Sequence, residues 1–278
     1  MSARSATRKA TNLFVAVLAT AAALATLAVL ASILWTLISR GLPAFHWSVL
    51  TTSMKPTGEH GGLANAIVGS LIQVGLGMAI AVPVGVLAGT YLSEYAKGSR
   101  IGDVTRFVSD ILLSAPSILI GLFVYVLLVA TTKTYSGFAG GVALAVIAIP
   151  IIARTTEDML SLVPVALREA AAALGAPKWK VVTLIAWRAA GSGMLTGILL
   201  ALARSAGETA PLLFTSLGNL NWSTSLARPM ASLPVAIYQF ASSPYDDLVQ
   251  LAWAGALVIT LGVLAINIAA QLTVGRRS

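Results

Sequence analysis

The chain has 278 residues, of which 57% are hydrophobic and only 10% are charged, against about 25% charged residues in a typical soluble domain. Several uncharged stretches reach the roughly 20 residues that a helix needs to cross a bilayer core of about 30 Å. This composition excludes an ordinary soluble domain and predicts an all-α, polytopic membrane protein. The chain contains no cysteine, which excludes disulfides and thiol chemistry.

The hydropathy pattern predicts six transmembrane helices within a single membrane domain that covers residues 1–278. Their approximate bounds are 12–38, 63–92, 107–131, 138–160, 186–217 and 247–272. The first span follows a basic N-terminus, so a secretory signal is the alternative. The hydrophobic region of such a signal has about 7–15 residues, whereas the apolar stretch from Leu13 to Ile38 is nearly twice as long. We therefore expect an uncleaved first span.

The basic residues predict the topology. A net charge of +8 could suggest nucleic acid, but thirteen of the eighteen Lys and Arg fall on one side of the predicted spans. These are Arg4, Arg8, Lys9, Lys97, Arg100, Arg106, Arg154, Arg168, Lys178, Lys180, Arg188, Arg276 and Arg277. Only four fall on the other side, namely Arg40, Lys55, Lys133 and Arg228. Because cytoplasmic loops carry the excess of Lys and Arg, we expect both termini to be cytoplasmic.

In chain order, the first outer loop holds the only histidines, His46 and His60, which we interpret as solvated because neither belongs to a metal-ligand pattern. The second span contains glycines that permit close helix packing, and Pro83, which removes one backbone hydrogen bond and predicts a bend. Pro116 predicts another kink in the third span. Asp246 and Asp247 are expected to be solvated acids at the start of the last helix.

A short cytoplasmic helix is predicted at about 165–175. Pro164 suits a helix start, a run of Ala follows, and Gly175 suits a left-handed stop. Its small residues offer a smooth surface to a partner, with Arg168 and Glu169 available for polar contacts. The alternative is an amphipathic helix that rests on lipid headgroups. The spacing alone leaves both interpretations open.

Arg204 and Glu208 stand inside the fifth span, where an ionised side chain costs roughly 2.5–3.5 kcal/mol on insertion scales. Their spacing of four places both charges on one face of a helix, within reach of each other. At about 1.5 Å per residue, Arg204 lies roughly 24 Å along the helix from Arg188, well beyond the inner surface. Pro211 predicts a kink beside the pair. We interpret the pair as part of a transport path, with a purely structural ion pair as the alternative.

The same span carries small residues at every fourth position, which predict a close-packing stripe. They are Gly193, Gly197, Ala201, Ser205 and Thr209.

These motifs resemble a known family. Glu169-Ala-Ala, with Gly175 six positions later, resembles the EAA loop of permease subunits of ATP-binding-cassette (ABC) importers. The stretch Leu202-Ala-Arg-Ser-Ala-Gly-Glu-Thr-Ala-Pro-Leu-Leu-Phe214 resembles the PstA-type permeases of phosphate importers. Further matches lie at 115–123, 154–158, 164–169 and 232–240, so the resemblance covers most of the chain from the second span onward. One departure is Ile185-Ala-Trp-Arg188, where the family's EAA loop usually ends in a proline-containing step.

The resemblance implies a type I ABC importer permease (MetI-like) fold in a bacterial plasma (inner) membrane. It also implies three partners: a homologous PstC-type permease, a dimer of PstB-type ATP-binding subunits, and an extracytoplasmic PstS-type phosphate-binding protein. The ATPase would receive the cytoplasmic helix, with coupling residues Arg168, Glu169, Ala170, Ala171 and Gly175. ATP and Mg²⁺ would be bound by that partner, since this chain has no Gly-x-x-x-x-Gly-Lys-Ser/Thr loop. The chain itself is then a permease without a catalytic or metal site.

The resulting hypothesis is that Arg204, Glu208 and Thr209 lie on the phosphate path. Arg204 supplies positive potential, because a guanidinium suits phosphate geometry, and Glu208 neutralises it when the path is closed. Three other functions stay open: an importer permease for sulfate, molybdate or an amino acid; an intramembrane enzyme; and a secondary transporter, of which six spans would form half.

Overall fold

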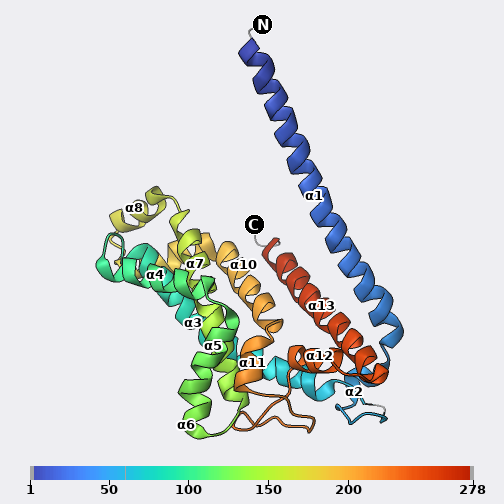
Figure 1. Ribbon diagram of the computed structural model, residues 1–278. Coiled ribbons are helices and arrows are strands. Elements are labelled where there is room, and N and C mark those ends of the chain that lie inside the picture. Colours follow the sequence, from blue (N-terminus) through green and yellow to red (C-terminus); the bar gives the residue numbers. More distant parts are fainter. Residues whose placement is uncertain (1–2, 60, 276–278) are drawn as a thin grey trace.

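The computed structural model describes residues 3–59 and 61–275, and over these ranges the chain is helical without strands (Figure 1). The α-helices are α1 (Ala3–Ala44), α2 (Trp47–Thr51), α3 (Ala64–Glu94), α4 (Arg100–Ser114), α5 (Ser117–Val124), α6 (Ala130–Thr132), α7 (Gly137–Ser161), α8 (Val165–Ala173), α9 (Lys178–Lys180), α10 (Trp187–Ala206), α11 (Ala210–Thr215), α12 (Leu233–Ala241) and α13 (Asp246–Gly275). Two π-helical segments join them, η1 (Tyr125–Val129) and η2 (Val181–Ala186). The predicted all-α class is confirmed. His60, Arg276 and Arg277 lie outside the described residues.

Within the part of the chain that the structure describes, five helices are long and apolar enough to cross a membrane. They lie at Thr11–Ala44, Ala64–Glu94, Gly137–Ser161, Lys178–Ala206 and Asp246–Ile268. A sixth span is formed if the bent pair Arg100–Ser114 and Ser117–Thr132 is taken as one. The chain is therefore a multi-pass membrane protein.

The third span, expected at 107–131 with a kink at Pro116, is a strongly bent pair of helices that begins earlier, at Arg100. α4 and the segment that begins with α5 meet at an angle of 107°. The break lies at Ala115, which is extended, and Pro116, which has φ of −57° and ψ of 129°. A proline disfavours the helical conformation of the residue before it, so the kink predicted at Pro116 is present as a sharp turn.

The helix ends fall on two opposite sides of the molecule. Figure 1 shows the N-terminal end of α1, the C-terminal end of α13 and α8 on one side. α2, α6 and the extended segment that follows α11 lie on the opposite side. The predicted loops with excess positive charge thus share one side of the fold.

The centre of the fold is the pair α3 and α7, which make the most extensive helix–helix contact among the described residues. Glycines of α3 bring the two backbones together. A Cβ atom at Gly85 would stand 2.7 Å from the Ile152 Cβ, and one at Gly89 would collide with the Ala153 carbonyl oxygen. Gly75, by contrast, faces open space. The expected role of the span-two glycines in close packing is therefore seen at Gly85 and Gly89, and α3 continues unbroken through Pro83.

α1 stands apart from this core and projects away from it in Figure 1. Its side chains from Leu13 to Ile38 are almost all exposed. Close contact occurs near its C-terminal end, where a Cβ at Gly41 would stand 3.0 Å from the Leu257 Cβ of α13.

The fifth span begins earlier than the predicted residue 186, because Lys178–Ala206 forms one continuous helical stretch through α9, η2 and α10. No proline interrupts the helix at Ile185-Ala-Trp-Arg188 or elsewhere between residues 178 and 206. α12 was not expected at all. It starts after Ser232 and has Pro234 in its first turn, a position that suits proline because the early N–H groups of a helix lack partners.

Candidate functional site

A break in the helix at the end of the fifth apolar span, Lys178–Ala206, carries the charged residues Arg204 and Glu208. α10 ends at Ala206, three residues follow without regular helix, and α11 begins at Ala210. The amide of Gly207 turns back to the Arg204 carbonyl oxygen (3.1 Å). Pro211 occupies the first turn of α11, so the kink predicted beside Pro211 is a full interruption that begins before it.

Arg204 and Glu208 form an ion pair across this break, with 3.5 Å between Arg204 Nε and Glu208 Oε1. The two side chains differ in exposure, since 47% of Arg204 but only 15% of Glu208 is accessible. Their proximity is as the spacing predicted, although the helix ends between them. Irregular backbone at membrane depth occurs only where protein buries it or where it lines water. The break therefore argues against contact of this site with lipid tails.

The break is held by close packing on either side. Gly197 of α10 is buried so closely against Thr155 of α7 that a Cβ would collide with the threonine side chain. Ala201 and Ser205 continue this buried stripe, which confirms its predicted packing role in α10. Thr209 does not extend the stripe within α10. It lies in the break, and its carbonyl oxygen accepts hydrogen bonds from the amides of Leu212 and Leu213 in α11.

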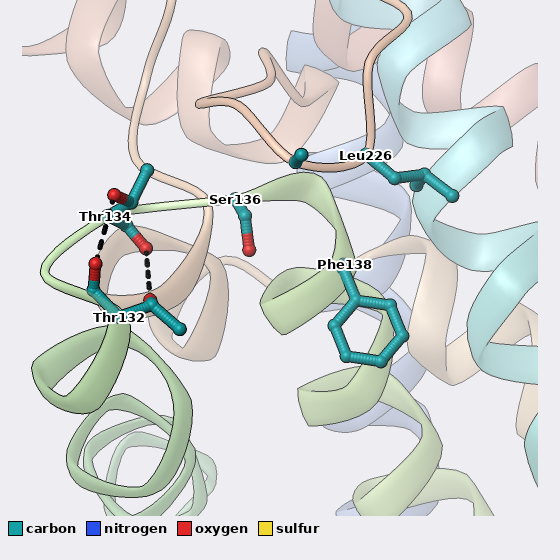
Figure 2. Close-up of a pocket in the computed structure, with 6 residues that line it drawn as sticks. Thr132, Thr134, Ser136, Phe138 and Leu226 are labelled. Carbon is teal, nitrogen blue, oxygen red and sulfur yellow. Dashed lines mark hydrogen bonds between the residues drawn. The ribbon is translucent and has the colours of Figure 1, made fainter.

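A pocket of about 500 Å³ opens on the side of the molecule that carries α6 (Figure 2). Its walls are Thr132, Thr134, Ser136, Phe138, Leu226 and Ala227. The hydroxyl groups of Thr132 and Thr134 each donate to the other's carbonyl oxygen, at 3.3 and 3.2 Å. Their donor hydrogens are thus engaged within the wall, and none of the three predicted path residues lines this pocket. We do not assign it to the transport path.

The short helix predicted at about 165–175 is present as α8, slightly shorter than predicted. It begins after Pro164 and ends at Ala173, and the left-handed residue Gly175, with φ of +80°, follows two residues later. The amides of Gly175 and Ala176 donate to the carbonyls of Ala172 and Ala171, a hydrogen-bond pattern that terminates many helices. The predicted left-handed stop is therefore found at the expected glycine.

The predicted coupling residues point in two directions. Glu169 and Ala170 are exposed, and Ala171 is half-buried. Arg168 instead turns inward, where its Nη2 atom lies 2.7 Å from Glu94 Oε1 at the end of α3. Arg168 is therefore not free for the polar contacts with a partner that the sequence suggested, because it is already paired within this chain.

Sequence reasoning missed the partners of the inner arginines. Glu94 pairs with Arg168, and Glu157 of α7 pairs with Arg106 of α4 at 2.8 Å. The sequence hinted at such pairs only through its small number of acidic residues, since the chain has ten Asp and Glu in all. That number does not show which acid pairs with which arginine.

Comparisons with known proteins place the chain in a family. Residues 81–277 match the family described as the inner membrane component of binding-protein-dependent transport systems. The chain is 53% identical to the "Phosphate transport system permease protein PstA" of Pasteurella multocida, over 88% of each chain. It is 57% identical to the protein of that name from Haemophilus influenzae, over 86% of this chain and 85% of the relative.

A solved structure described as an inward-facing conformation of the MetNI methionine ABC transporter has the same fold. It matches with a TM-score of 0.64 and 20% identity, covering 77% of this chain and 94% of the other. The expected type I importer permease fold is thus confirmed, as is the expectation of a permease subunit rather than an enzyme. The chain belongs to the family of inner membrane components of binding-protein-dependent transport systems and, within it, to the PstA permeases.

Proposed function

We propose that this chain is a membrane subunit of an ATP-driven importer of inorganic phosphate and forms half of the translocation path. The observation that carries the proposal is the Arg204–Glu208 ion pair at the helix break that follows the apolar span Lys178–Ala206. The relatives from Pasteurella multocida and Haemophilus influenzae are phosphate transport permeases, which supports phosphate as the substrate. A sulfate, molybdate or amino-acid importer is the alternative, and solute competition separates the two.

The ion pair suits a gate for an oxyanion. The guanidinium presents planar N–H donors that match phosphate oxygens, while Glu208 holds that charge neutral and repels anions when the path is shut. We propose that opening separates the two side chains, so that phosphate replaces Glu208 at Arg204. Thr209, next to Glu208 in the break, places its hydroxyl on the same path.

The exposure of Arg204 supports a second permease of the PstC type. Nearly half of this side chain is accessible in the single subunit, yet a charged group facing lipid tails is strongly disfavoured. We propose that a homologous permease covers this face and completes the path. A PstS-type phosphate-binding protein would deliver phosphate from the extracytoplasmic side.

Energy would come from a PstB-type dimer that binds ATP and Mg²⁺. We propose that α8 docks in this ATPase through its exposed face, where Glu169, Ala170 and Gly175 are accessible and Leu174 is 89% exposed. Ala171 would lie at the edge of this contact. In this assembly α8 and both termini are cytoplasmic, in a bacterial plasma (inner) membrane.

The test is ATP-dependent uptake of labelled phosphate by proteoliposomes that hold this chain with its three partners. Arg204→Ala and Glu208→Ala are expected to assemble at native abundance and to lose uptake, whereas Leu200→Ala, an exposed position on the same helix, serves as the matched control. Undiminished uptake by both charge variants contradicts the gate. Arg204→Lys keeps the positive charge but removes the planar guanidinium donors, so it separates the two contributions. Thr209→Val removes the hydroxyl and tests its part in uptake. Competition with sulfate, molybdate and amino acids identifies the solute.

A further inference from the structure

Arg168 connects α8 to the ends of two other helices. Its Nη2 atom lies 2.7 Å from Glu94 Oε1, at the last residue of α3, and 2.6 Å from the Leu160 carbonyl oxygen of α7. Its Nη1 atom donates to the Val163 carbonyl oxygen at 2.6 Å. Only 16% of the Arg168 side chain and 8% of the Glu94 side chain are accessible. Arg168 is therefore partly buried, and all three of its acceptors lie within this subunit.

A second arginine joins the same two helix ends. Arg106 of α4 lies 2.8 Å from Glu157 Oε1 of α7, and its Nη2 atom donates to the Leu92 carbonyl oxygen of α3 at 3.1 Å. The inner ends of α3 and α7 are therefore bridged twice, once from α4 and once from α8. Both bridges pair a guanidinium with a carboxylate and with backbone oxygen, and charge-assisted hydrogen bonds of this kind are the stronger ones.

α3 and α7 behave mechanically as one unit, because their backbones are in contact at Gly85 and Gly89. A close-packed interface of this kind has few voids and transmits displacement. α7 in turn packs against α10, which carries Arg204, through the contact of Thr155 with Gly197. One chain of contacts from α8 to α10 therefore runs from Arg168 through Glu94 of α3 and Leu160 of α7, beside the direct packing of α8 on η2.

None of the residues of α8 is buried, and besides the bonds of Arg168 the helix contacts η2. We propose that Arg168 and Glu94 form a positioning pair that transmits the displacement of α8 to the α3–α7 unit and from there to α10. This inference rests on the proposed docking of α8 in an ATPase. Arg168 then acts from the inner side of the helix, while the exposed face of α8 makes the contact with the ATPase.

The pair predicts uncoupling rather than loss of the complex. The variants are Glu94→Gln, Arg168→Gln and the double variant, with Arg188→Gln as the matched control, because Arg188 is an exposed arginine on the same side. In proteoliposomes with all partners, ATP hydrolysis and phosphate uptake are measured on the same preparation.

We expect Glu94→Gln and Arg168→Gln to retain assembly and hydrolysis and to lower phosphate transported per ATP by about five-fold or more. The double variant should lose no more than Arg168→Gln alone, because the pair acts as one interaction. Arg168→Lys, which keeps the charge but not the fork, should retain an intermediate ratio.

Several outcomes contradict the inference. They are an unchanged ratio in Glu94→Gln, additive losses in the double variant, or equal falls of hydrolysis and uptake. If Arg168→Gln fails to assemble, the ratio measured in Glu94→Gln decides the question, because this variant leaves the hydrogen bonds of Arg168 to the Leu160 and Val163 carbonyls in place. If neither variant assembles, the pair is purely structural and the inference is wrong. The native complex separates failure of this inference from failure of the proposed function. If the native preparation shows no ATP-dependent phosphate uptake, the proposed function and the docking of α8 are wrong. If it shows uptake and the variants keep the native ratio, only the role of the Arg168–Glu94 pair is wrong.

Discussion

Gly121 of α5 lies directly against Pro211 of α11, so that a Cβ atom at Gly121 would stand 2.6 Å from the Pro211 Cα. This contact joins the two interrupted spans. α5 follows the sharp turn at Pro116, and α11 follows the break that carries Arg204 and Glu208. The helices that follow the two interruptions thus pack directly against each other.

Gly121→Ala is expected to push α5 and α11 apart. Overpacking costs about 1–3 kcal/mol, and the displacement falls next to the Arg204–Glu208 pair, so both thermal stability and phosphate uptake should decrease. Thermal unfolding in detergent and uptake in proteoliposomes measure the two effects. Gly75→Ala is the control, since a Cβ there meets nothing within 4 Å. Native stability in Gly121→Ala would show that the interface can relax.

Gly197→Ala should weaken the contact between α10 and α7, because the new methyl group collides with the Thr155 side chain. We expect a loss of about 1–3 kcal/mol in stability and reduced uptake. Gly191→Ala on the same helix meets no neighbour within 4 Å and should behave like the native chain. The comparison of their unfolding temperatures checks the prediction, and equal temperatures would contradict it.

Asn65→Ala should loosen the outer segment that follows α11. The Asn65 carboxamide accepts from the Met54 amide (3.0 Å) and donates to the Asn219 and Leu220 carbonyls (3.3 and 2.9 Å). An unpaired buried polar group costs about 1–3 kcal/mol. Limited proteolysis should therefore cut residues 216–232 sooner than in the native chain or in Asn221→Ala, an exposed control. Equal cleavage rates would rule out this role.

Gly175→Ala should weaken the association with the ATPase. The residue has φ of +80° with open space around it, so a side chain brings backbone strain without a clash, at about 1–2 kcal/mol for a left-handed residue. Gly175→Asn should be milder, because asparagine visits this conformation more readily. Copurification of the ATP-binding subunit measures the order expected, native above Asn above Ala. A reversed order would show that α8 does not need this termination.

Local patterns predicted much of this molecule because they depend on near neighbours in the sequence. The spacing of Arg204 and Glu208 predicted their contact, and Gly175 predicted the end of α8. Pro116 predicted where the third span departs from a straight helix, but not the angle, since that depends on the packing of α5 against α11.

The inward direction of Arg168 was beyond sequence reasoning. It follows from Glu94, which lies 74 residues away in the chain and reaches Arg168 only once α3 and α7 are packed. α12 was missed for a related reason, since its nine residues are too few to cross a membrane and their helix is stabilised by contacts with α13 and α3.

The length of α1 sets how this chain meets the thickness of its bilayer. At about 1.5 Å per residue, the apolar stretch from Leu13 to Ile38 measures about 39 Å, longer than a hydrocarbon layer of about 30 Å. Such a mismatch is relieved by tilting, here by about 40°, or by local thickening of the lipid. A thicker membrane would bring α1 closer to the bilayer normal and so change its angle to α13. The tilt of α1 therefore depends on lipid composition.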